Sequence, residues 1–162
     1  MNMSLKACVP VKPYLLKFVQ HIDNIKEDEP LNLNNGGVVG NVLKGYLTTK
    51  MKLQRRETKK SYASLEKEYT AILWYEVYDD LKQFNSFYIS KKSIVAFNTF
   101  LHRLFHEMLL FKIMEGLEEG INAKDTTIRF MEKFGIEDTV DVDSLKKANY
   151  RLRLSKKIDI FQ

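Results

Sequence analysis

The chain has 162 residues, of which 44% are hydrophobic and 12% aromatic, a composition typical of a folded domain and not of a disordered polymer. Its formal net charge is +5, and its single cysteine, Cys8, excludes an internal disulfide framework and fits a reducing compartment. The N-terminus lacks the apolar core of a signal peptide and no apolar run is long enough to span a bilayer, so we expect a cytoplasmic protein with no membrane partner.

The first part of the chain predicts a strand–helix–strand–helix lobe. Proline favours an extended segment at 9–11, and Pro13 suits the first turn of the helix that follows. The alternating residues 31–33 predict a second strand, and Asn34 or Asn35 is expected to cap a second helix.

The middle of the chain is expected to contribute a strand and a long helix to the core or to a contact with a second copy. Segment 68–80 favours a strand buried on both faces, because it is rich in aromatic and β-branched residues, although its apolar residues also fit a helical period. Residues 90–116 predict the long helix, with Ser90 as its N-cap and Gly116 and Gly120 at its end. Its apolar residues recur mostly at three- and four-residue steps: Ile94, Phe97, Leu101, Leu104, Phe105, Met108 and Phe111.

The C-terminal residues predict two helices joined by a turn. The first spans 123–136 and stops at Gly135, and the last runs to about Lys157 after a short acidic turn. The inward side chains expected on the first helix are Ile128, Met131 and Phe134, and the expected cap of the last helix is Asp143 or Ser144.

The expected fold class is therefore α+β and mainly helical, in three parts. Residues 1–60 form an N-terminal α/β lobe with a basic connector, and residues 61–120 hold the central strand and the long helix used for the core or for dimerisation. Residues 121–162 form a helix-turn-helix-like lobe.

Two basic clusters stand apart from the acidic residues. The first, at 48–60, contains six Lys or Arg against one Glu and has no apolar periodicity, so we interpret it as an exposed connector or a frayed helix end. The second, DSLKKANYRLRLSKK at 143–157, contains six Lys or Arg and no acid after Asp143. Charge separated in this way creates a surface field that attracts polyanions.

Placed on a helix, the second cluster has a narrow apolar stripe and a broad basic face. Leu145, Ala148 and Leu152 make the stripe, with Asn149 at its edge. The basic face predicts contact with the DNA major groove, although a basic C-terminal helix also complements its own dipole and can simply be solvated. The residues expected to bind DNA are Lys146, Lys147, Asn149, Tyr150, Arg151, Arg153, Lys156 and Lys157, together with Arg55 and Arg56 of the first cluster.

The last forty residues or so resemble the C-terminal helix-turn-helix of Mor-type phage transcription activators and of small DNA-binding proteins of Bacteroides-type prophages and mobile elements. The residues that carry the resemblance are Ile128, Phe130, Gly135, Ile136, Leu145, Lys147, Tyr150, Arg151 and Arg153. The resemblance implies a dimer whose N-terminal half pairs the subunits and whose C-terminal half reads DNA. The N-terminal half of this chain does not match that pattern.

Signals for other chemistry are weak. His102 and His106 are four residues apart but lack an HExxH motif and a third ligand, so we interpret them as helix-surface histidines. The glycines at 34–41 match neither phosphate-binding motif, and Cys8 has no histidine nearby in the sequence. We therefore expect no enzyme, no metal, no cofactor and no small-molecule substrate.

The leading hypothesis is a double-stranded DNA-binding regulator of a phage or mobile element, acting as a homodimer with its last helix in the major groove. The alternative is a non-enzymatic structural or adaptor protein whose basic surface binds an acidic protein partner. Aromatic residues at 74–78 and 84–88 are expected in the core, and their exposure would instead favour a single-strand binder.

Overall fold

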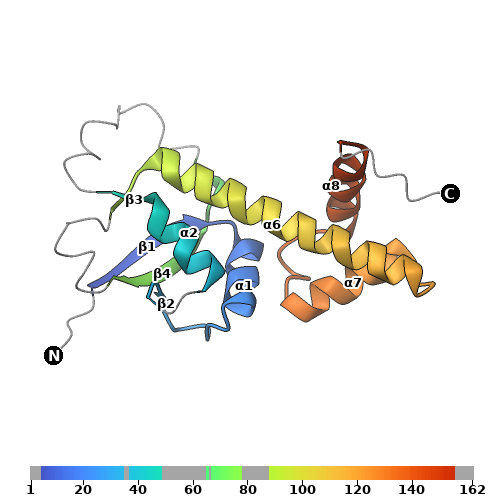
Figure 1. Ribbon diagram of the computed structural model, residues 1–162, viewed down its shortest axis with the longest axis horizontal. Helices are drawn as coiled ribbons and strands as arrows, with labels where there is room; N and C mark the ends of the chain where they lie inside the picture. The colour runs from blue at the N-terminus through green and yellow to red at the C-terminus, as the bar shows by residue number, and fades with distance from the viewer. Residues whose placement is uncertain (1–4, 35–36, 49–64, 66, 78–87, 156–162) are drawn as a thin grey trace. The chain divides into compact units, whose positions relative to one another are not determined.

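The computed structural model describes residues 5–34, 37–48, 65, 67–77 and 88–155, and its fold is α+β and mainly helical, as predicted (Figure 1). The chain divides into two compact units, Met1–Leu101 and His102–Gln162, which we call unit 1 and unit 2. The division falls within α6 (Lys91–Glu118), and the predicted middle part, 61–120, is thus shared between the two units.

Unit 1 contains a three-stranded sheet in which β4 (Ala71–Val77) is the central strand. It pairs antiparallel with β1 (Leu5–Val11), in a register that places Cys8 opposite Trp74, and parallel with β2 (Leu31–Asn32). The predicted strands in all three segments are confirmed. A parallel pair requires a crossover connection, which the chain makes after β2.

Only one face of β4 is buried, so the prediction of a strand buried on both faces is wrong. Leu73, Tyr75 and Val77 are buried, whereas Ile72 and Trp74 are 41% and 53% exposed. Alternate residues of a strand point to opposite faces, and a mainly antiparallel sheet can leave one face in water. Aromatic and β-branched residues at 71–77 favoured a strand without indicating that one face is open.

Two helices complete the described core of unit 1. Helix α1 (Pro13–Ile22) has proline in its first turn as predicted and buries Leu15, Phe18 and Val19 completely. Helix α2 (Val38–Tyr46) buries Val39 and Leu43. A short antiparallel pair, β3 (Leu47–Thr48) with β5 (Tyr88–Ile89), follows α2.

The N-cap of α2 is Gly37, not Asn34 or Asn35, the second of which lies outside the described residues. The Asp23 carboxylate accepts a hydrogen bond from the Gly40 backbone N–H at 3.4 Å, so a distant side chain serves the first turn of the helix. A Cβ atom on Gly37 would lie 2.6 Å from Asp23 Oδ2, and this close approach explains the glycine.

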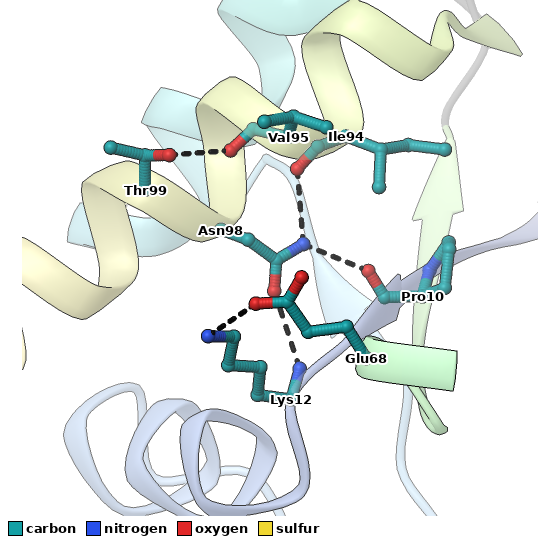
Figure 2. A network of polar contacts seen from close by, with 7 residues as sticks. All are labelled: Pro10, Lys12, Glu68, Ile94, Val95, Asn98 and Thr99. Atoms are coloured by element: carbon teal, nitrogen blue, oxygen red, sulfur yellow. Dashed lines mark hydrogen bonds and ion pairs between the residues drawn. The ribbon is translucent and has the colours of Figure 1, made fainter. Parts of the chain in front are cut away.

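The start of α6 is held to the chain between β1 and α1 by a buried asparagine (Figure 2). Asn98 Nδ2 donates to the carbonyl oxygens of Pro10 and Ile94 at 2.9 and 3.0 Å, and its Oδ1 accepts from the Lys12 backbone N–H at 3.2 Å. Ser90 caps the helix as predicted, since its hydroxyl oxygen accepts from the Ser93 N–H at 3.1 Å.

Unit 2 is built from the C-terminal part of α6, α7 (Ala123–Phe134) and α8 (Val142–Ser155) (Figure 1). Its core lies where α6 meets α7, and the rings of Phe105 and Phe130 have centroids 5.4 Å apart. The buried apolar residues of the unit are Phe105, Leu109, Leu110, Ile113, Phe130, Met131, Phe134, Ile136 and Leu145.

Glycines shape both turns of unit 2, though not always as predicted. Gly135, with φ of +60°, ends α7 as expected, and Gly120, with φ of +78°, follows the end of α6. Gly116 does not end α6 but lies inside it, where a Cβ atom would be 2.4 Å from Thr126 Oγ1 of α7. Ile128 is only half-buried, and Thr127 takes the inward position beside it.

Candidate nucleic-acid interface

Helix α8 begins earlier than the sequence predicted. Its cap is Asp141, whose Oδ2 accepts a hydrogen bond from the Ser144 backbone N–H at 2.9 Å. Neither Asp143 nor Ser144 is the cap, since both lie inside the helix. Two acids therefore stand at the N-terminal end of α8.

The connection between α7 and α8 is longer than a helix-turn-helix normally has. It comprises residues 135–141, seven in all, whereas the motif uses about three or four. Ile136 in this connection is completely buried, and its carbonyl oxygen accepts from the Thr139 N–H at 3.0 Å. The predicted short acidic turn is thus an ordered loop anchored in the core.

One face of α8 is exposed and basic. Lys147, Tyr150, Arg151 and Leu154 are all exposed, and their three- and four-residue spacing places them on the same side of the helix. Tyr150 is 59% exposed. We call these four residues the outer face of α8.

The cations of the outer face have no neutralising partner among the residues that the structure describes. Lys146, beside this face, forms an ion pair with Asp143 at 3.7 Å. Among the described residues, neither Lys147 nor Arg151 has an ion-pair partner. Their charge is therefore available to an anion.

Charge is unevenly distributed along α8. Asp141 and Asp143 lie at the N-terminal end, and the cations begin at Lys146. This order complements the helix dipole, which is its simplest explanation. It also means that a polyanion is attracted to the C-terminal half of the helix and repelled by its first turn.

Asn149 does not belong to the outer face, contrary to the prediction that it contacts DNA. It is 1% exposed and, with Leu145, forms the buried side of α8. The reason is that the buried arc of the helix is centred on Leu145 and Asn149, whereas Ala148 and Leu152 of the predicted stripe are only half-buried. Arg153 is half-buried as well, and its Nε atom is inaccessible to solvent.

The remaining predicted contacts lie outside the described residues. These are Lys156 and Lys157 after α8, and Arg55 and Arg56 of the first basic cluster. The described interface therefore consists of α8 alone.

A groove between α6 and α7 was not anticipated from the sequence. It has a volume of about 520 Å³ and is lined by apolar side chains, including Met108 and Phe130, and by charged residues of both helices. Phe111, which lines it, is 63% exposed, although its spacing had grouped it with the inward residues of the long helix. The apolar residues of α6 thus extend over more of the helix surface than the core of unit 2 covers.

The histidine pair is partly buried. His102 is exposed as predicted, but His106 is buried, and the two rings have centroids 4.3 Å apart. Within the described part of the chain, no three His, Cys, Asp or Glu side chains gather into a group that could hold a metal ion.

Trp74 is exposed, against the expectation that the aromatic residues at 74–78 lie in the core, whereas Tyr75 is buried as expected.

In the described ranges, no helix is both long and apolar enough to cross a membrane.

Comparison of the whole chain with models of protein families, with curated proteins and with solved structures finds no match.

Proposed function

We propose that the protein binds double-stranded DNA through the outer face of α8. The observation that carries the proposal is the pair of exposed cations, Lys147 and Arg151, which flank an exposed tyrosine and have no ion-pair partner in the described residues. Lysine and arginine supply electrostatic affinity for phosphates, and tyrosine can contact the backbone as well.

The charge order of α8 favours one mode of docking. In a helix-turn-helix, residues near the N-terminus of the recognition helix contact the bases. Here that end carries Asp141 and Asp143, which repel phosphates. The C-terminal half of α8 is therefore the part that meets the duplex.

The biological role is a further proposal that rests on the resemblance of the last forty residues to Mor-type activators. On that basis the protein is a cytoplasmic regulator of transcription of a phage or mobile element and acts as a homodimer. Lys156, Lys157, Arg55 and Arg56 would add phosphate contacts to those of α8.

The test is a double charge reversal, Lys147→Glu with Arg151→Glu, measured by fluorescence anisotropy against mixed-sequence duplex DNA at two salt concentrations. We expect affinity at low salt to fall on the order of a hundredfold, and the log–log salt slope to shrink by about 0.9 for each phosphate that the variant no longer neutralises. Both side chains are exposed, so the fold should be retained.

The matched control is Lys44→Glu with Lys92→Glu, which changes the charge equally at two exposed lysines of unit 1. This control should lose far less affinity. Equal losses in the two double variants would mean that net charge alone attracts DNA, and an unchanged affinity in the α8 variant would remove α8 from the interface.

A second candidate, a structural or adaptor protein, is favoured by the groove between α6 and α7. Phe111, which lines it, is 63% exposed. Exposed apolar surface of this kind is typical of protein contacts. A stable oligomer that shows no affinity for DNA at low salt would support this candidate over the first.

A further inference from the structure

A hollow within unit 2 extends from the buried side of α8 to Lys147, Tyr150 and Arg151 of its outer face. Its volume is about 720 Å³, within the range of small-molecule sites. Ile113 of α6 and Ala123 and Thr127 of α7 line one side of it, and α8 lines the other.

Asn149 lines this hollow without a hydrogen-bond partner. The residue is 1% exposed, and neither its Oδ1 nor its Nδ2 is bonded to any group in the described structure. An unsatisfied buried amide destabilises a fold, and such groups are few in native proteins. The free amide of Asn149 therefore indicates a binding role.

Arg153 repeats the pattern one turn further along. Its Nε is buried and also lacks a partner among the described residues. Lys146, Asn149 and Arg153 are spaced by three and four residues, so they form one row along α8 with the amide between two cations.

The hollow is strongly basic. Lys146, Lys147, Arg151 and Arg153 line it against one acid, Asp143, which is paired with Lys146 at 3.7 Å. The Thr127 hydroxyl donates to the Ala123 carbonyl oxygen at 2.7 Å, which leaves its oxygen able to accept. The lining thus combines cations, an unused amide and an apolar wall.

We propose that this hollow binds a nucleotide. The Asn149 side chain offers a donor and an acceptor side by side, which matches the hydrogen-bonding edge of a base. Arg153 and Arg151 bind the phosphate, and Tyr150, which is 59% exposed and also lines the hollow, supplies a ring for stacking.

The nucleotide can come from two sources, a free mononucleotide or an unpaired nucleotide of a nucleic-acid strand. The inference goes beyond duplex binding because Asn149 and Arg153, which lie off the outer face of α8, carry it, while Tyr150 and Arg151 serve both proposals. It also departs from the sequence-based expectation of no small-molecule ligand.

The experiment uses the full chain and isothermal titration calorimetry. The probes are the four deoxynucleoside 5′-monophosphates and an eight-nucleotide single strand of mixed sequence. The parent should bind at least one of these two kinds of probe. Asn149→Leu and Arg153→Gln should each weaken binding on the order of tenfold, the effect of losing one or two hydrogen bonds to the ligand.

Lys124→Gln is the matched control for Arg153→Gln, because Lys124 is exposed on α7, does not line the hollow and loses the same single positive charge. It should bind like the parent. Circular dichroism confirms folding of each variant, and if Asn149→Leu does not fold, Arg153→Gln carries the test.

Each outcome either identifies the source of the nucleotide or overturns the proposal. Binding of mononucleotides identifies a free nucleotide as a sufficient ligand, and binding of the single strand alone identifies an unpaired nucleotide in a chain. The proposal is overturned if the parent binds neither probe, or if folded Asn149→Leu and Arg153→Gln bind as the parent does. A parent that binds nucleotide but not duplex DNA removes the proposed function and leaves this inference standing.

Discussion

Two buried asparagines, one in each unit, have opposite surroundings. Asn98 of unit 1 is 2% exposed, and both ends of its amide are hydrogen-bonded to backbone groups (Figure 2). Asn149 of unit 2 is 1% exposed, and neither end is bonded in the described structure. Although both residues are equally hidden from water, the bonded amide of Asn98 stabilises the fold, whereas the unbonded amide of Asn149 destabilises it.

This difference separates a structural role from a binding role. The amide of Asn98 bonds the Lys12 N–H and the Pro10 carbonyl oxygen and so joins α6 to the chain where β1 ends and α1 begins. Asn149 satisfies nothing and faces a basic hollow. Stability explains the first residue, and the proposed ligand would explain the second.

The largest effect is expected from Asn98→Leu. Removal of the amide leaves one backbone donor and one backbone acceptor unsatisfied, so the free energy of unfolding should fall by about 3 kcal/mol. Urea unfolding followed by the fluorescence of Trp74, the single tryptophan, measures this in unit 1.

Thr99→Ala is the control for this prediction. Thr99 is exposed on the next position of α6, and its hydroxyl donates only to the Val95 carbonyl oxygen. Its loss should change stability by less than about 0.5 kcal/mol. If Asn98→Leu cost no more than the control, the amide would not hold the junction together.

The opposite sign is expected for Asn149→Leu. The change removes an unsatisfied buried amide and adds apolar volume, so the free energy of unfolding should rise by about 1 kcal/mol. For a chain of this size that corresponds to a rise in Tm of roughly 2–4 °C, measurable by calorimetry. A loss of stability similar to that of Asn98→Leu would show that the Asn149 amide is satisfied, and the contrast between the two residues would disappear.

Apolar periodicity in the sequence predicts much of the fold. The long helix and the helix ending at Gly135 follow from the spacing of apolar residues and from glycine, whereas the strand within 68–80 follows from its aromatic and β-branched residues. The cap of α2 was misplaced because Asp23, the side chain that serves it, is distant in the sequence. Local rules for capping do not detect such a partner.

The candidate site was predictable only in part. The spacing of Lys147, Tyr150 and Arg151 places them together on any helix, and the structure exposes all three. The burial of Asn149 depends on how α8 packs in unit 2, which helical periodicity does not specify. Whether its amide has a partner is a property of three-dimensional packing alone.

In its role, Asp23 of unit 1 is intermediate between the two asparagines. Its carboxylate is partly buried and accepts a hydrogen bond from the Gly40 N–H. Burial raises the pKa of the carboxyl group, and the backbone N–H groups of Gly40 and Val39 oppose that rise. An acid whose pKa is raised by folding contributes stability below its unfolded pKa, and this contribution is lost as the pH rises through the folded pKa.

Asp23→Asn should therefore be slightly more stable than the parent at pH 7, by less than about 1 kcal/mol because the group is partly solvated. The asparagine oxygen can still accept from the Gly40 N–H. The advantage should vanish as the pH falls below about 4, where the aspartate is protonated in both states. Urea unfolding at pH 7 and pH 3.5 measures both values. A less stable variant at pH 7 would mean that attraction between the carboxylate and the N-terminus of α2 outweighs the cost of burial, and Asp23 would then resemble Asn98 in its role.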